Sequence, residues 1–292
     1  MEVASYEDLK SLFPYDPIVV IEYCKNIICA ASNFEDFQEF LDYHSENSNI
    51  STCQNEWSDR MSIHCNDCAT DINSCVCLEC FLNGNHQGHD YLISINSSGN
   101  CDCGDTSFWK PSGFCAKHQG LEQDSHPENY LDEKLRTTLT DTIFKASFNS
   151  IRKLEDDNTE SLSEILDFLK LFLQFGDGFR RLIAISLTEK VNFEKFMTHL
   201  FECSYEFNQQ IQSFFGLLTS DELFKTKFAL INYKLMIKTV IPLSINAVRG
   251  NDVDSYQNTR PWDQFWFHSY TVPLLQKCVK KHDFDWFSFT FK

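Results

Sequence analysis

The sequence predicts a small loop-rich domain followed by a mainly α-helical domain. Nine of the thirteen cysteines and four of the nine histidines fall between residues 53 and 118, where Gly, Asn and Ser are frequent and apolar residues are few. After about residue 131, apolar side chains recur at spacings of three and four, the period of an amphipathic helix. A chain of 292 residues can hold both domains.

The charge balance excludes one large class of partners. Twenty-five basic residues against forty-two acidic ones give a formal net charge of −17, so we expect no nucleic-acid partner. The longest apolar run, 18–31, contains Glu22 and Lys25 and is too short to span a bilayer, so we expect no membrane partner either. An odd cysteine count without a visible secretory signal favours a reducing compartment, the cytoplasm with the nucleus as an alternative.

Residues 1–50 are expected to form a helical N-terminal segment with a packing role. Pro17 suits the first turn of a helix, and apolar residues follow it through Ile28. Residues 32–35 (SNFE) have the pattern of a capping box, after which apolar side chains continue at helical spacing. The polar run 45–52 then separates this segment from the next.

The segment 51–120 has the composition of a metal-dependent domain. Its C-x2-C, H-x2-H and C-x-C spacings are typical of zinc ligands. Burial of so few apolar side chains cannot offset the conformational entropy that the chain loses on folding. Bound metal must therefore supply the folding free energy. We therefore expect the segment to be unfolded without zinc.

Ligand counting suggests more than one site. Cys65, Cys68, His86 and His89 form one tetrahedral set. Seven candidates then remain once Cys75 is set aside as a buried apolar residue: Cys53, Cys77, Cys80, Cys101, Cys103, Cys115 and His118. Seven is one short of two four-ligand sites, and a binuclear centre with one bridging thiolate resolves the shortage. The alternative is that a few of these cysteines are buried apolar residues.

The region 131–292 is expected to be a helical bundle or array. Helical segments are predicted at 164–175, 179–187, 193–203, 207–218 and 221–248, with capping boxes at 161–164 and 219–222, a stop at Gly176 and Gly178, and a kink or break at Pro242. The end, 261–292, is rich in Trp and Phe. No second cysteine and histidine cluster follows His118 in the sequence.

The order of motifs resembles a known zinc domain. CNDCATD (65–71), CLECF (77–81), HQGHDY (86–91) and CDCGD (101–105), followed by Trp109, resemble the UBR box of N-recognin ubiquitin ligases. The resemblance implies three zinc ions. It places one on Cys65, Cys68, His86 and His89. It places a second on Cys53, Cys77, Cys80 and Cys103, and a third on Cys80, Cys101, Cys115 and His118, with Cys80 bridging.

The resemblance also implies a substrate site made of carboxylates. Residues matching Asp71, Asp102 and Asp105 line a shallow pocket for the first residue of a substrate in that family. Asp102 and the backbone carbonyl of Asn100 should hold the α-ammonium group, and Asp71 and Asp105 should favour a basic side chain (Arg, Lys or His). The alternative is that these aspartates are solvated or orient the ligand histidines.

The implied function is recognition of basic N-terminal residues as the substrate-binding part of an E3 ubiquitin-protein ligase. The expected partners are N-terminal segments of substrates and a ubiquitin-conjugating enzyme or a RING-bearing region or subunit. Two alternatives stay open. The chain is part of an active RING-type transferase, although the sequence holds no RING or other catalytic centre, or it is a zinc-binding scaffold whose box has lost N-terminal residue binding.

Overall fold

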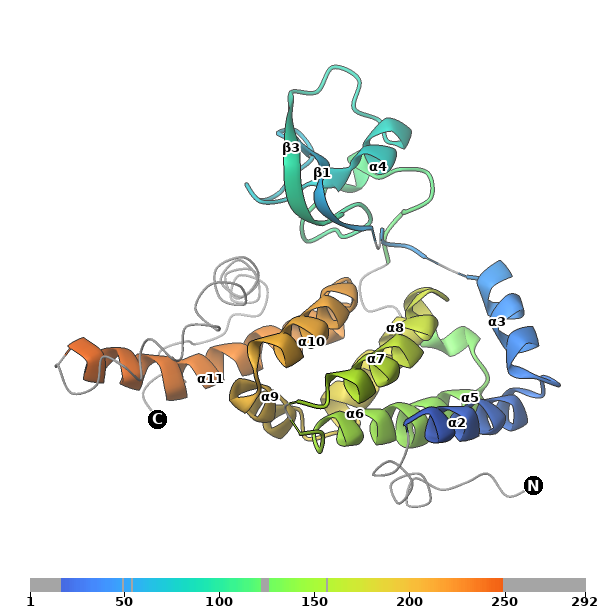
Figure 1. Cartoon of the computed structure of the whole chain (residues 1–292). Helices are drawn as coiled ribbons and strands as arrows, with labels where there is room; N and C mark the ends of the chain where they lie inside the picture. The colour runs from blue at the N-terminus through green and yellow to red at the C-terminus, as the bar shows by residue number, and fades with distance from the viewer. Residues whose placement is uncertain (1–16, 49, 54, 122–125, 156, 249–292) are drawn as a thin grey trace.

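The computed structural model describes residues 17–48, 50–53, 55–121, 126–155 and 157–248. A small sheet domain lies at one end of a larger helical body (Figure 1). The elements in chain order are α2 (Pro17–Ser32), α3 (Phe37–Glu46), β1 (Glu56–Cys65), β2 (Val76–Cys77), α4 (Leu78–Asn83), β3 (Tyr91–Asn100), η1 (Pro111–Gly113), η2 (Pro127–Tyr130), α5 (Glu133–Thr137), η3 (Thr138–Phe144), α6 (Lys145–Ile151), α7 (Thr159–Leu173), α8 (Asp177–Ile185), η4 (Ser186–Lys190), α9 (Phe193–Glu202), α10 (Tyr205–Leu218) and α11 (Glu222–Val248).

The sheet domain is more regular than a loop-rich segment. Its three strands are antiparallel in the order β2-β1-β3, and β1 and β3 pair over ten residues each. Cys65 at the end of β1 lies opposite Tyr91 at the start of β3. The strands are difficult to predict because most of β3 is exposed, so the sequence shows no clean alternation of apolar and polar residues.

The core of the sheet domain consists mainly of cysteines. Trp57, Ile63, Trp109 and Phe114 are the largest buried apolar side chains in the described part of this domain, and nine cysteines pack with them, Cys75 only partly buried. A core so small supplies little hydrophobic free energy, as the composition predicted.

The helical body has a phenylalanine-rich core that also includes the N-terminal helices. Val20, Ile28 and Phe40 of α2 and α3 are buried in one cluster with residues from Leu131 to Leu235. Phe40 lies within about 6 Å of the rings of Phe172, Phe175 and Phe179. α2 and α3 thus pack into the core of the helical body, and the division of the chain at 50, 120 and 131 stays a prediction.

Most helices lie where the periodicity predicted them, but their caps differ. α2 begins at Pro17, as expected. The predicted capping box at 32–35 is wrong, because Ser32 ends α2. Asp36 is the N-cap of α3 and accepts a hydrogen bond from the Glu39 N–H. The reciprocal box bond survives in shifted form, since the Glu39 carboxylate accepts from the Glu35 N–H at 2.9 Å.

Two later boundaries are also corrected. α7 begins at Thr159, two residues before the expected box at 161–164, because Asn158 is its N-cap. Within 219–222, Thr219 closes α10 and Asp221 caps α11 through the Phe224 N–H. α11 continues through Pro242 without a break, and Gly178 lies in the first turn of α8, so it does not end the preceding helix. The aromatic segment 261–292 lies outside the described residues.

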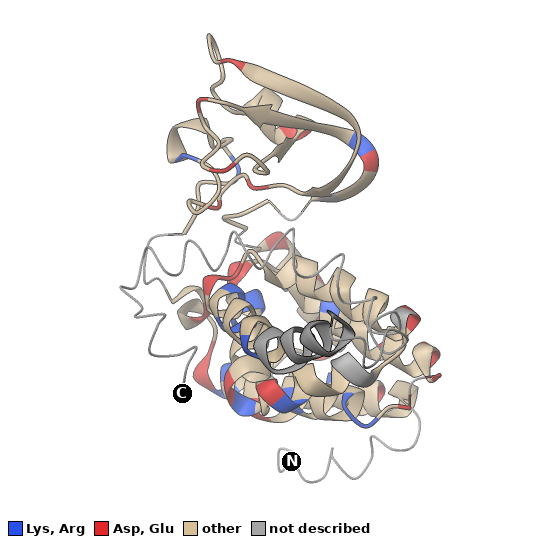
Figure 2. Cartoon of the chain, turned by 90° about the vertical axis from the view of Figure 1, so that its left-hand side faces the viewer, with Lys and Arg blue, Asp and Glu red and all other residues tan. Residues whose placement is uncertain are grey.

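Charge is spread over both parts of the molecule. Asp and Glu occur on several separate elements of the sheet domain and of the helical body (Figure 2). Among the helices that the structure describes, none is long and apolar enough to cross a membrane.

Candidate metal centre and N-terminus site

The first cysteine and histidine cluster joins the end of β1 to the loop after α4. Cys65 and Cys68 lie on one tight turn, in which Cys68 and Ala69 both donate to the Cys65 carbonyl. The Cys68 Sγ lies 3.6 Å from Nδ1 of His86 and 3.4 Å from Nδ1 of His89. Sulfur and nitrogen ligands at about 2.3 and 2.0 Å from a tetrahedral zinc lie about 3.5 Å apart, so the set fits one ion.

The second and third clusters share Cys80 on α4. One set is Cys53, Cys77, Cys80 and Cys101, and the other is Cys80, Cys103, Cys115 and His118, with the ligand atoms of each set within 4.8 Å of one another. The Nδ1 of His118 lies 3.3 Å from the Cys80 sulfur and 3.2 Å from the Cys115 sulfur. The shared thiolate agrees with the ligand count.

The expected assignment of Cys101 and Cys103 is wrong. The structure groups Cys101 with Cys53 and Cys77, and it groups Cys103 with Cys115 and His118, the reverse of what the resemblance implied. On an extended chain residues i and i+2 share one face, but here the chain turns at Cys103 and Gly104, so the two sulfurs fall in different sets. Spacing alone does not say which cysteine faces which site.

The chemistry of the crowded sulfurs fits a divalent cation. Hydrogen bonding with Cys101 raises the pKa of the Cys80 thiol, whereas hydrogen bonding with Cys80 lowers the pKa of Cys103 to about 5. The bond to Cys103 also raises the pKa of His118. The sulfurs therefore share protons, because several adjacent thiolates repel one another. A zinc ion would replace those protons and let every ligand sulfur ionise.

Cys75, which was expected to be a buried apolar residue, belongs to none of these sets. It is partly buried, and burial together with the nearby Asp102 carboxylate raises the pKa of its thiol to about 12. The residue is therefore a neutral thiol at physiological pH.

Asp102 and Asn100 meet at Cys75. The Asp102 carboxylate accepts a hydrogen bond from the Cys75 N–H at 2.7 Å, and the Asp102 N–H donates to the Cys75 carbonyl at 2.9 Å. The Cys75 Sγ lies 4.0 Å from the Asn100 carbonyl oxygen. The two predicted acceptors of the ammonium group, the Asp102 carboxylate and the Asn100 carbonyl, thus both lie beside Cys75. The backbone that holds them there also carries metal ligands.

Asp71 lies on the turn that leads to Cys75. Its carboxylate accepts from the Asn73 N–H at 2.9 Å, and its carbonyl accepts from the Ser74 N–H. The preceding residue, Thr70, bonds to the carbonyls of Ser107 and Phe108. The loop that carries Asp71 is therefore fastened to the loop that follows Asp105.

Asp105 has partners on both carboxylate oxygens. One oxygen accepts from the Ser107 N–H at 2.8 Å, and the other forms an ion pair with the Lys225 ammonium of α11. The side chains of Lys225 and Asp105 are 8% and 16% exposed, and the Lys225 Nζ lies 4.7 Å from the centre of the Phe108 ring. Sequence reasoning missed Lys225, because nothing in its local pattern points to a residue 120 positions away.

Comparison with known proteins decides the family of the sheet domain. Residues 52–118 match the zinc finger of N-recognins. This segment is a UBR box. The chain is similar to the Arabidopsis thaliana E3 ubiquitin-protein ligase PRT6, at 26% identity over 61% of the chain and 10% of that protein. It is similar to the Homo sapiens ligase UBR2 at 37% identity over 29% of the chain and 5% of that protein, and to the Drosophila melanogaster ligase Ubr3 at 31% over 40% and 5%. The chain thus matches a tenth or less of these proteins.

Proposed function

We propose that the UBR box of this chain binds the free amino terminus of substrate proteins and prefers a basic first residue. In this proposal the chain supplies the substrate-recognition step of an E3 ubiquitin-protein ligase in ubiquitin-dependent degradation. The observation that carries the proposal is the placement of the Asp102 carboxylate and the Asn100 carbonyl around Cys75. An α-ammonium group has three donors and a positive charge, and anionic and carbonyl oxygens are its natural acceptors.

Rigidity supports the same proposal. Asp102 lies between Cys101 and Cys103, which belong to two different metal sets, so metal binding on both sides would fix its backbone. A preorganised carboxylate loses little conformational entropy when it binds an ammonium. Zinc, in this account, supplies folding free energy and no reaction chemistry, with three ions held as one C2H2 site and one binuclear site bridged by Cys80.

The preference for a basic side chain rests on Asp71 and Asp105. The Asp71 carboxylate accepts a hydrogen bond from the Asn73 N–H, and the Asp105 carboxylate accepts one from the Ser107 N–H. Each bond holds its carboxylate in place. A Lys, Arg or His side chain of the substrate would gain charge-assisted hydrogen bonds there. The ion pair between Asp105 and Lys225 weakens this part of the site.

A second function has one observation in its favour. The helical body already contacts the expected site twice, through Lys225 on Asp105 and through a 3.4 Å hydrogen bond from the Asn100 amide to the Gly216 carbonyl. Such contacts suit a zinc-stabilised scaffold whose box only docks on the helices. Neither function assigns ubiquitin transfer to these residues. The conjugating enzyme or RING region that transfer needs is not assigned to them either.

Isothermal titration with peptides that begin with Arg, Leu or Met separates the two functions. The zinc-loaded chain should bind the Arg-starting peptide most tightly. Asp102→Asn, which keeps the shape of the side chain and removes its charge, should weaken binding at least tenfold with zinc content unchanged. Asp59→Asn removes a carboxylate from β1 and is the matched control, because Asn tolerates the positive φ of that position. Absence of binding of all three peptides by the zinc-loaded wild type would leave the scaffold function, and equal binding by a fully metallated Asp102→Asn chain would contradict the role of Asp102.

A further inference from the structure

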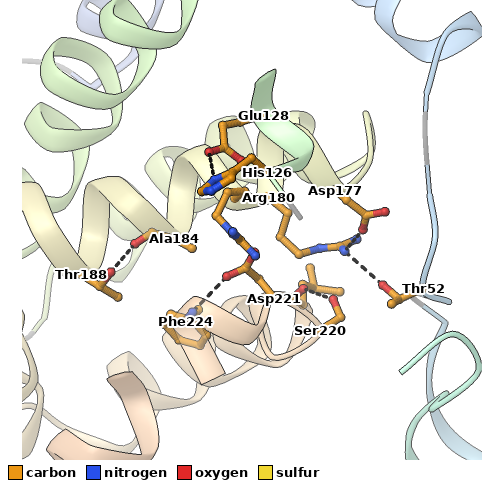
Figure 3. Close-up of polar contacts among 12 residues, drawn as sticks. Thr52, His126, Glu128, Asp177, Arg180, Ala184, Thr188, Ser220, Asp221 and Phe224 are labelled. Atoms are coloured by element: carbon orange, nitrogen blue, oxygen red, sulfur yellow. Dashed lines mark hydrogen bonds and ion pairs between the residues drawn. The ribbon is translucent and has the colours of Figure 1, made fainter. Parts of the chain in front are cut away.

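The turn between α10 and α11 brings a cation from the helical body to the UBR box. Lys225 lies in the first turn of α11, four residues after the cap Asp221. Asp221 is itself held by the Arg181 Nε at 2.6 Å, so the start of α11 is anchored to α8. Figure 3 shows Asp221, Phe224 and Ser220 of this turn beside Arg180 and Asp177. The helical body therefore positions the backbone at Lys225.

The Lys225 ammonium is held by two groups of the box. It pairs with the Asp105 carboxylate and stands over the Phe108 ring. Both residues follow the CDC motif on a single loop, and their partner is almost fully buried. In a buried ion pair of this kind the cation offsets the negative charge of the carboxylate, so the carboxylate attracts a third charged group more weakly.

We propose that Lys225 is a specificity-determining residue of the N-terminus site, which sets how strongly the site selects a basic first residue. The inference rests on the proposed function. Asp105 carries one negative charge, and Lys225 already balances it, so a basic side chain of the substrate must compete with an internal cation. The contacts described above for Asp102 and Asn100 are to Cys75 and Gly216, whereas Lys225 acts on the site through Asp105. Lys225 should therefore reduce affinity for basic first residues and leave binding of the amino terminus itself unchanged.

A second possibility is that the pair only fastens α11 to the box. Removing Lys225 would then lower stability, and it would change binding of all peptides by the same factor. The ratio of affinities for an Arg-starting and an Ala-starting peptide of otherwise identical sequence distinguishes the two roles, because a loss of folded protein cancels in the ratio.

The experiment measures this ratio by isothermal titration of the zinc-loaded chain. Lys225→Met keeps the apolar stem beside Phe108 and removes the charge, and we expect it to raise the Arg-to-Ala ratio about tenfold. Lys225→Gln, which can still donate to Asp105, should do the same and serves if the Met variant does not fold. Lys227→Met removes an equal charge from the exposed face of α11 and should leave the ratio unchanged. Adding Asp105→Asn to Lys225→Met should abolish the gain.

Two outcomes overturn the inference in different ways. An unchanged ratio in folded Lys225→Met and Lys225→Gln, with binding that still depends on Asp102, rejects the role of Lys225 and keeps the proposed function. Absence of binding to every free-amino peptide by the wild type and both variants rejects both.

Discussion

Asp177 and Arg180 lie one turn apart on α8 and form an ion pair of 2.5 Å whose side chains are 3% and 1% exposed. The pair holds the segment that leads into the UBR box. The Asp177 carboxylate accepts from the Ser51 N–H at 2.6 Å, and the Arg180 guanidinium lies 3.2 Å from the Thr52 hydroxyl (Figure 3). The helical body therefore contacts the box at its entrance through α8 and at Asp105 through α11.

Removing the charge of Arg180 should destabilise the chain strongly. Arg180→Met leaves the Asp177 carboxylate buried and uncompensated, which costs about 3–5 kcal/mol of unfolding free energy. The exposed pair Lys170–Asp167 has the same spacing on α7, so Lys170→Met is the matched control, with a loss of about 0.5 kcal/mol or less. Urea denaturation followed by circular dichroism measures both. Similar losses in the two variants would show that the buried pair has no special role.

Zinc content should depend unequally on the cysteines. Because Cys80 belongs to two sets, Cys80→Ser should lower the zinc content from the proposed three ions per chain to about one. Cys65→Ser should remove one ion, and Cys75→Ser should remove none. Atomic emission spectroscopy of the purified variants gives these numbers. Retention of two ions by Cys80→Ser would contradict the bridged centre.

Gly104 should tolerate no side chain. Its φ is +92°, and a Cβ there would lie 2.2 Å from the Ser51 carbonyl oxygen. We expect Gly104→Ala to cost about 3 kcal/mol or more, since both backbone strain and a backbone clash must be relieved. Gly88 has a φ of +80° and open space around it, so Gly88→Ala should cost only the strain, about 1 kcal/mol. Thermal unfolding of the two variants compares them, and equal midpoints would contradict the clash.

Local signals explain how much the sequence could predict. The metal ligands were found because zinc requires cysteine and histidine at short spacings, and the helices because a buried helical face repeats every three to four residues. The caps at Asp36 and Asn158 were missed, since several Ser, Asn and Asp residues lie near each helix start and only the backbone decides which one caps.

Contacts between distant segments could not be predicted. The ion pair of Lys225 with Asp105 and the bond from Ser51 to Asp177 join residues more than a hundred positions apart. Their partners look like ordinary surface charges in the sequence. The assignment of the aspartates to substrate binding came from the resemblance and stays a prediction.

His44 should make the helical body less stable in acid. Burial among the rings of Phe40, Phe175 and Phe179 lowers its pKa from 6.5 to about 4. Below pH 6.5 the imidazole of His44 binds a proton in the unfolded chain but stays neutral in the folded chain. The free energy of unfolding therefore falls as the pH drops from 6.5 towards 4, by about 3 kcal/mol in all.

The matched variant His44→Phe isolates this effect. The difference in unfolding free energy between wild type and variant should change by about 1 kcal/mol between about pH 7 and about pH 5.5, with the wild type losing more. Zinc release in acid affects both chains equally and cancels. A difference that does not depend on pH would contradict the buried neutral imidazole.

Recognition of a free amino terminus by the box can be tested with one Arg-starting peptide whose α-amino group is either free or acetylated. The zinc-loaded wild-type chain is titrated with each form. Acetylation removes the cation and leaves the side chain intact, so we expect binding of the free peptide and a loss of at least a hundredfold for the acetylated one. Equal affinity for the two peptides would contradict such recognition.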